Sequence, residues 1–161
     1  MTMPGNAIMD QLELEGYDRD WFAKCKSHLC HFATMGEGPV PVSICNDPFS
    51  YHRILDYFQN DALDTSGYVI NNNLQHLLGK KIANMDEFTR SFASYTRKGL
   101  YSFMPIISDD YPVKKYVLVS YPAIPLDVEN IPGNIIDCIR FTLGNIEEVI
   151  DIELLMPFIT N

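Results

Sequence analysis

The clearest helical pattern lies in residues 86–98, where apolar side chains recur every three or four positions. Phe92 lies in the middle of this apolar face, and Gly99 is placed to end the helix. A second helix is predicted to begin at Pro48, because Asp47 is a favourable capping residue and proline fits the first helical turn.

The segment 18–32 allows two predictions. Asp18 is a suitable helix cap, and apolar residues follow it at helical spacing: Trp21, Phe22, Cys25, Leu29 and Phe32. Residues 28–35 also alternate well enough for a strand. The two predictions are therefore a helix over 18–32, and a helix that breaks near His28 and is followed by a strand.

Several shorter elements are predicted from alternation and from turn residues. They are a strand over 40–45, a strand over 67–70, and a short helix capped by 71–73 and ended by Gly79.

After Gly99 the apolar period changes from helical spacing to two, which is typical of strands. Residues 100–121 are predicted to form a β-hairpin, and 122–134 an irregular, proline-containing crossing. Strands over 135–143 and 146–155 are expected to pair across a Gly-Asn turn. This order predicts an α+β fold with helices packed on one face of a mostly antiparallel sheet.

The length of 161 residues and the hydrophobic fraction of 47% fit one domain spanning 1–161, with 1–10 loosely ordered. Residues 1–11 lack the basic and apolar regions of a secretory signal, and no apolar run is long enough to span a membrane. We therefore expect a cytoplasmic protein with reduced thiols, or a component of a virion or secreted assembly.

The net charge of −9 argues against nucleic acid or an anionic membrane as the main partner and is compatible with a basic protein. The charge is uneven along the chain. Residues 76–121 carry a net +3 between two segments that carry −6 each. Packing of the middle segment against its neighbours would neutralise these charges; otherwise the surface has two faces of opposite sign.

Most of the potential metal ligands are concentrated near the N-terminus: Cys25, His28, Cys30, His31, Cys45 and His52. Their spacing lacks the paired knuckles of structural zinc sites. On either a helix or a strand, at most two of the first four side chains converge. We therefore expect buried thiols beside partly exposed histidines, with no metal and no cofactor.

Recognisable catalytic motifs are lacking in the sequence. It contains neither a nucleophile elbow nor a phosphate-binding loop. Gly36-Glu37-Gly38 lacks the third glycine of a dinucleotide-binding turn. An enzyme would therefore need a composite site that the sequence does not reveal.

Two surface features are candidates for binding a partner. On the last predicted strand, Glu147, Asp151 and Glu153 share one face as a row of like charges without a neighbouring lysine. The predicted hairpin is rich in tyrosine, a residue enriched at protein interfaces; the candidates are Tyr101, Tyr116 and Tyr121. A solvated strand edge and ordinary sheet packing are the alternative explanations.

These observations favour a small acidic protein-binding module, of the inhibitor or immunity type, that neutralises a basic partner surface. The alternative is a structural subunit of a larger assembly, such as a phage or secretion-apparatus component. A third hypothesis is an enzyme with a composite site.

We predict that the purified protein carries no stoichiometric zinc, because the Cys and His side chains do not converge. Elemental analysis checks this. A content of about one zinc per chain, lost in the Cys25→Ser and Cys30→Ser variants, would contradict the prediction.

Overall fold

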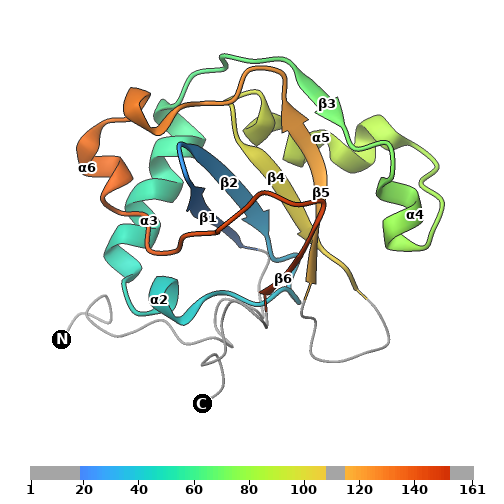
Figure 1. Cartoon of the computed structure of the whole chain (residues 1–161), viewed down its shortest axis with the longest axis horizontal. Coiled ribbons are helices and arrows are strands. Elements are labelled where there is room, and N and C mark those ends of the chain that lie inside the picture. Colours follow the sequence, from blue (N-terminus) through green and yellow to red (C-terminus); the bar gives the residue numbers. More distant parts are fainter. Residues whose placement is uncertain (1–18, 108–114, 153–161) are drawn as a thin grey trace.

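The structure, a computed structural model, describes residues 19–107 and 115–152. It has an α+β fold built on a mixed sheet that curls into a half-barrel (Figure 1). The strands are β1 (Asp20–Cys25), β2 (His28–Ala33), β3 (Tyr68–Ile70), β4 (Tyr101–Pro105), β5 (Lys115–Pro122) and β6 (Val149–Asp151). The α-helices are α2 (Val42–Cys45), α3 (Pro48–Asp56), α4 (Leu74–Leu78), α5 (Met85–Thr96) and α6 (Gly133–Ile136). A short π-helix at Tyr57–Asp61 follows α3, and a 3₁₀-helix lies at Val128–Asn130.

The strand order is β1-β2-β4-β5-β3, and β6 pairs with the other half of β5. The pairing of β2 with β4 is parallel, and the other pairings among the described strands are antiparallel. The chain between β2 and β4 contains α2 to α5, which is ample length for a parallel crossover.

The expected helix over 18–32 is wrong: residues 20–33 form the β1–β2 hairpin, turned at Lys26, whose φ is 56°. Asp18, its expected cap, lies outside the described residues. The alternative strand over 28–35 is confirmed in β2. Both strands are buried on both faces, so consecutive residues such as Trp21 and Phe22 are apolar and no alternation is visible. That continuous apolar run coincidentally satisfies helical spacing.

The expected strand over 40–45 is also wrong, because Val42–Cys45 form the short helix α2 after Pro41. The helix predicted at Pro48 is confirmed, with the Asp47 carboxylate accepting a hydrogen bond from the Ser50 backbone N–H at 3.1 Å.

The predicted elements between 67 and 121 are largely confirmed, including β3, α4 and the antiparallel pairing of β4 with β5. Residues 108–114 of the predicted hairpin lie outside the described residues. Gly79 ends α4 in the left-handed conformation, at φ 70°. Helix α5 begins one residue earlier than expected, because the Asn84 side chain caps the Glu87 N–H at 3.1 Å.

The predicted C-terminal hairpin is wrong. Residues 133–136 form α6, and the only described bridge near the expected strand 135–143 joins Thr142 to Lys24. Strand β6 exists but pairs with β5. Ile135 packs in a buried cluster with Ile131, and this tertiary contact overrides the β-preference of isoleucine.

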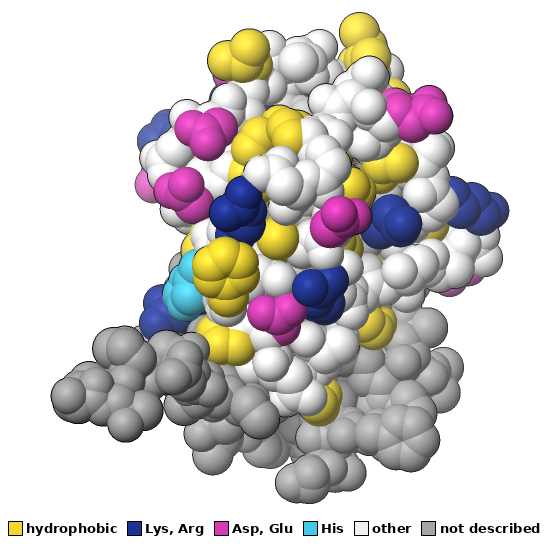
Figure 2. Space-filling model, turned by 90° about the vertical axis from the view of Figure 1, so that its left-hand side faces the viewer, with side chains coloured by type: hydrophobic (Ala, Val, Ile, Leu, Met, Phe, Trp, Pro, Cys, Tyr) yellow, Lys and Arg dark blue, Asp and Glu magenta, His cyan; other side chains and the backbone are white. Residues whose placement is uncertain are grey.

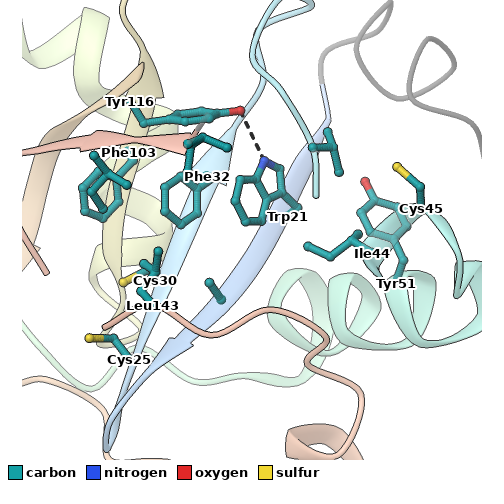
Figure 3. Packing of buried hydrophobic residues seen from close by; sticks show 14 residues of the cluster. Trp21, Cys25, Cys30, Phe32, Ile44, Cys45, Tyr51, Phe103, Tyr116 and Leu143 are labelled. Atoms are coloured by element: carbon teal, nitrogen blue, oxygen red, sulfur yellow. Dashed lines mark hydrogen bonds between the residues drawn. The ribbon is translucent and has the colours of Figure 1, made fainter. Parts of the chain in front are cut away.

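One face of the sheet is lined by stacked aromatic rings (Figure 3). The ring centroids of Trp21 and Phe32 lie 4.2 Å apart, and those of Phe32 and Phe103 lie 4.8 Å apart. The Tyr116 hydroxyl accepts from Trp21 Nε1 at 3.3 Å and donates to the Pro39 carbonyl at 3.0 Å.

The loop beside this aromatic stack approaches it closely. A Cβ at Gly38 would lie 2.3 Å from the Tyr116 hydroxyl oxygen, so only glycine fits there without a shift of the tyrosine.

The opposite face packs against α5 and α4, where Phe92 and Leu74 join Met104 and Val117 in a second cluster. The placement of all helices on one face is not confirmed. Helix α2 contributes to the aromatic face, and α3 contributes both to that face and to a third cluster. In Figure 1, α3 and α6 lie at one end of the sheet and α4 at the other.

We predict that Phe92→Ala lowers the free energy of unfolding by about 3–5 kcal/mol, because it removes a buried ring from the cluster under α5. Chemical denaturation checks this. A change below about 1 kcal/mol would mean that α5 is not packed as described.

Candidate binding cleft

A buried imidazole lies between two polar side chains from neighbouring strands. The His31 side chain, on β2, is 1% exposed. Its Nε2 lies 2.6 Å from Asp20 Oδ1 on β1, and its Nδ1 lies 2.5 Å from Ser102 Oγ on β4. Both ring nitrogens therefore have partners, as a buried histidine requires.

Tyr95 of α5 completes this network. Its ring stacks on His31 at 3.8 Å with an interplanar angle of 17°. Its hydroxyl donates to Asp20 Oδ2 at 3.1 Å and accepts from Gln59 Nε2 at 3.4 Å. Burial, together with the charge of Asp20, raises the pKa of Tyr95, so the hydroxyl keeps its proton and remains a donor.

The electrostatics of the network hold Asp20 in its charged form. Burial alone would raise the pKa of Asp20. The hydrogen bond and positive charge of His31, with the hydrogen bond from Tyr95, outweigh burial and lower the pKa below its ordinary value of 3.8. Asp20 is therefore a carboxylate at neutral pH, and its side chain is 27% exposed.

Asp20 faces a cleft of about 430 Å³ between the ends of β1 and β2 and one side of α5. This volume lies within the range of small-molecule pockets. Within the described part of the chain, the lining residues are Asp20, His31, Ala33, Met35, Phe88, Ser91, Phe92, Ser94 and Tyr95. Among these residues the charged or titratable groups are one carboxylate, one buried imidazole and one tyrosine, set among apolar side chains and two serines.

The edge of the cleft is formed partly by the turn after β2. Met35, 37% exposed, has φ 50°, which is uncommon for a residue with a side chain. The Thr34 carbonyl accepts hydrogen bonds from the Glu37 and Gly38 N–H groups, and these bonds fix the turn. The turn thereby holds the Met35 side chain at the cleft.

Asp20, His31 and Ser102 are the residue types of a serine-hydrolase triad, but their placement does not suit that chemistry. Ser102 is 0% exposed and does not line the cleft. A nucleophilic hydroxyl must reach the substrate, whereas here the exposed end of the network is the carboxylate. The arrangement positions a negative charge and does not present an activated serine.

The predicted acidic row is only partly within the described residues. Glu147 is exposed, Asp151 lies on β6, and Glu153 lies outside the described residues. The expectation that no lysine neighbours this row is wrong, because Lys115 of β5 is the register partner of Asp151. The row therefore carries less uncompensated charge than expected.

The three candidate tyrosines occupy different environments. Tyr116 is 0% exposed within the aromatic core, and Tyr101 is half-buried. Tyr121 is 37% exposed, and its cross-strand partner Val69 is 42% exposed. The structure thus leaves Tyr121 with the most accessible ring of the three.

The Cys and His candidates are dispersed. Cys25 and Cys30 lie in the aromatic core, as does Cys45 of α2, while His28 is half-buried and His52 is exposed. Burial raises the pKa of Cys25 and, more strongly, of Cys30, which favours their neutral thiols. Within residues 19–107 and 115–152, no group of three or more His, Cys, Asp or Glu side chains is placed to hold a metal ion.

Sequence reasoning missed Asp20, Ser102 and Tyr95 as members of one site. It grouped His31 with the cysteines, although its partners are a carboxylate and a hydroxyl. One signal was present: Asp20 begins the mostly apolar strand β1, and Ser102 lies within the mostly apolar strand β4. Such residues need a polar partner when they are buried.

Comparison of the chain with protein-family models, curated proteins and solved structures found no match. In the part of the chain that the structure describes, no helix has the length and apolar character needed to cross a membrane.

We predict that Asp20 makes stability depend on acid pH. Because the folded-state pKa of Asp20 is lowered, its stabilisation is present above the ordinary value of 3.8 and is lost as pH falls through the folded-state value. Between about pH 5 and pH 2, the unfolding free energy should therefore fall less steeply in Asp20→Asn than in the wild type. Denaturant titrations across this range measure the difference. Glu87→Gln, at an exposed position on α5, is the control, and equal slopes for Asp20→Asn and wild type would refute the prediction.

Proposed function

We propose that this protein is a small acidic binding module that occupies a basic surface of a protein partner, in the manner of an inhibitor or immunity protein. One observation carries the proposal: Asp20 is held as a carboxylate at a cleft lined by apolar and uncharged polar side chains together with His31. A partly desolvated, oriented carboxylate favours a cationic group of a partner over water.

The net charge of the protein supports this proposal less than the single carboxylate of Asp20 at the cleft does. The described residues contain fourteen Asp and Glu against eleven Lys and Arg, so they carry only −3 of the total −9. On the face shown in Figure 2, acidic and basic side chains are interspersed. That face produces no field of a single sign, so we assign recognition to the cleft and only long-range steering to the net charge.

An exposed apolar area gives further contact surface. Val69 and Tyr121 are paired across β3 and β5, and just beyond this pairing the Ile124 N–H donates to Ser66 Oγ at 2.8 Å. All three are among the exposed large hydrophobic residues. Exposed apolar groups of this kind often contact other proteins.

The same apolar area favours a second candidate function, a structural subunit of a larger assembly. Sedimentation of the purified protein separates the two functions. A monomer across the concentration range supports the binding module, and self-association that is lost in Tyr121→Ser supports the assembly subunit.

We predict that a basic protein from the native host is retained on the immobilised wild type and elutes with salt. Ionic screening acts within about 8–10 Å at ordinary ionic strength and weakens the charge attraction. Asp20→Asn should lose the partner, and Glu87→Gln should keep it. Pull-down with mass spectrometry, followed by binding kinetics on the identified protein, measures this.

The acidic row is tested in the same assay. Replacing Glu147, Asp151 and Glu153 by Gln and Asn should lower the association rate and flatten its salt dependence, with little change in folding.

A partner that binds Asp20→Asn with wild-type affinity would contradict the assignment of recognition to the cleft.

A further inference from the structure

We propose that the cleft beside Asp20 is a binding site for the guanidinium group of an arginine side chain supplied by the protein partner. The inference rests on the proposed function, and it specifies which group of the partner enters the cleft. Charge complementarity is the first argument, because Asp20 is the charged acceptor among the described lining residues, and none of these is lysine or arginine. His31, which pairs with Asp20 Oδ1, is 1% exposed, whereas the Asp20 side chain is 27% exposed, so the carboxylate is the group that a ligand in the cleft can reach.

The hydrogen-bonding capacity of Asp20 matches a forked donor. An ionised carboxylate offers about two lone-pair directions on each oxygen. Among the described residues, His31 donates to Oδ1 and Tyr95 donates to Oδ2. Each oxygen therefore keeps one further direction, and two parallel N–H groups of a guanidinium fit this arrangement.

The network also fixes the orientation of the carboxylate before binding. His31 is held by its hydrogen bond with Ser102 and by stacking on Tyr95. His31 and Tyr95 each donate a hydrogen bond to Asp20. A carboxylate that is already immobilised loses little side-chain entropy when a cation binds, which strengthens the interaction.

The walls of the cleft suit a flat, weakly hydrated cation. Phe88, Phe92 and Tyr95 come from consecutive turns of α5, and Met35 faces the cleft from the turn after β2. Guanidinium groups stack on aromatic rings and lose hydration more easily than ammonium groups do. Arginine therefore fits this site better than lysine.

Two aromatic rings of the protein, one of them the lining residue Phe88, already have a cation over them. Lys80 Nζ lies 5.3 Å from the centroid of Phe88, and Arg97 lies 4.8 Å from the centroid of Tyr68. Neither Lys80 nor Arg97 lines the cleft, so neither occupies the position beside Asp20.

The direct test uses Nα-acetyl-L-arginine amide as the probe, with its citrulline and lysine counterparts for comparison. Citrulline has nearly the same shape as arginine but carries no charge. Nuclear magnetic resonance of the full-length protein should show amide shifts in residues 33–35 and 88–95 with the arginine probe. The citrulline probe should bind about tenfold or more weakly, since a charge-assisted hydrogen bond is lost.

Two variants locate the site. Asp20→Asn removes the carboxylate, and Ser91→Phe fills the cleft from an exposed position on α5 without changing the Asp20 network. Both should weaken binding of the arginine probe about tenfold or more, and Glu87→Gln should leave it unchanged. If Asp20→Asn does not fold, Ser91→Phe decides the question alone. Equal binding of arginine and citrulline probes, or unchanged binding in Ser91→Phe, would overturn the proposal.

The test also separates this inference from the proposed function. A basic partner that binds the wild type and Ser91→Phe equally well would overturn the arginine site and leave the binding function standing. Specific binding of the arginine probe by a protein that retains no basic partner would support the guanidinium site and overturn the proposed function.

Discussion

The imidazole of His31, on β2, contacts side chains of β1, β4 and α5 and so links these three elements. It is buried, so each ring nitrogen must find a partner inside the protein. Asp20 on β1, Ser102 on β4 and the stacked ring of Tyr95 on α5 provide the contacts. The edge hairpin, the parallel neighbour strand and the long helix are thereby held in one relative position. A shift of any of them would leave a buried polar atom unpaired.

This constraint also explains why a charge can lie at the cleft. An isolated carboxylate beside apolar rings would be expensive to desolvate. Here two donors fixed by the core bond Asp20, and this lowers its pKa in spite of burial. The polar network therefore serves the fold and the candidate site together.

The elements that the sequence predicted well are those with local signals. Asp47 before Pro48, Gly79 and the hairpin of β4 with β5 are determined by caps, turn residues and period. The β1–β2 hairpin was missed because a sheet buried on both faces removes the alternation. The site was missed for a different reason. Asp20 meets His31 across the β1–β2 hairpin that was missed, and Ser102 meets His31 only through the parallel pairing of β2 with β4, which no local spacing encodes.

The aromatic core contains the only tryptophan of the chain, Trp21, which is fully buried and stacked on Phe32. Its position next to Asp20 on β1 gives the molecule a built-in fluorophore in a dry environment, with a single indole emission to interpret. Unfolding transfers that indole to water and shifts its emission to longer wavelength. Because Trp21 faces the side of the sheet opposite to the cleft, a variant that loses binding while keeping this emission has lost a contact and has kept its fold.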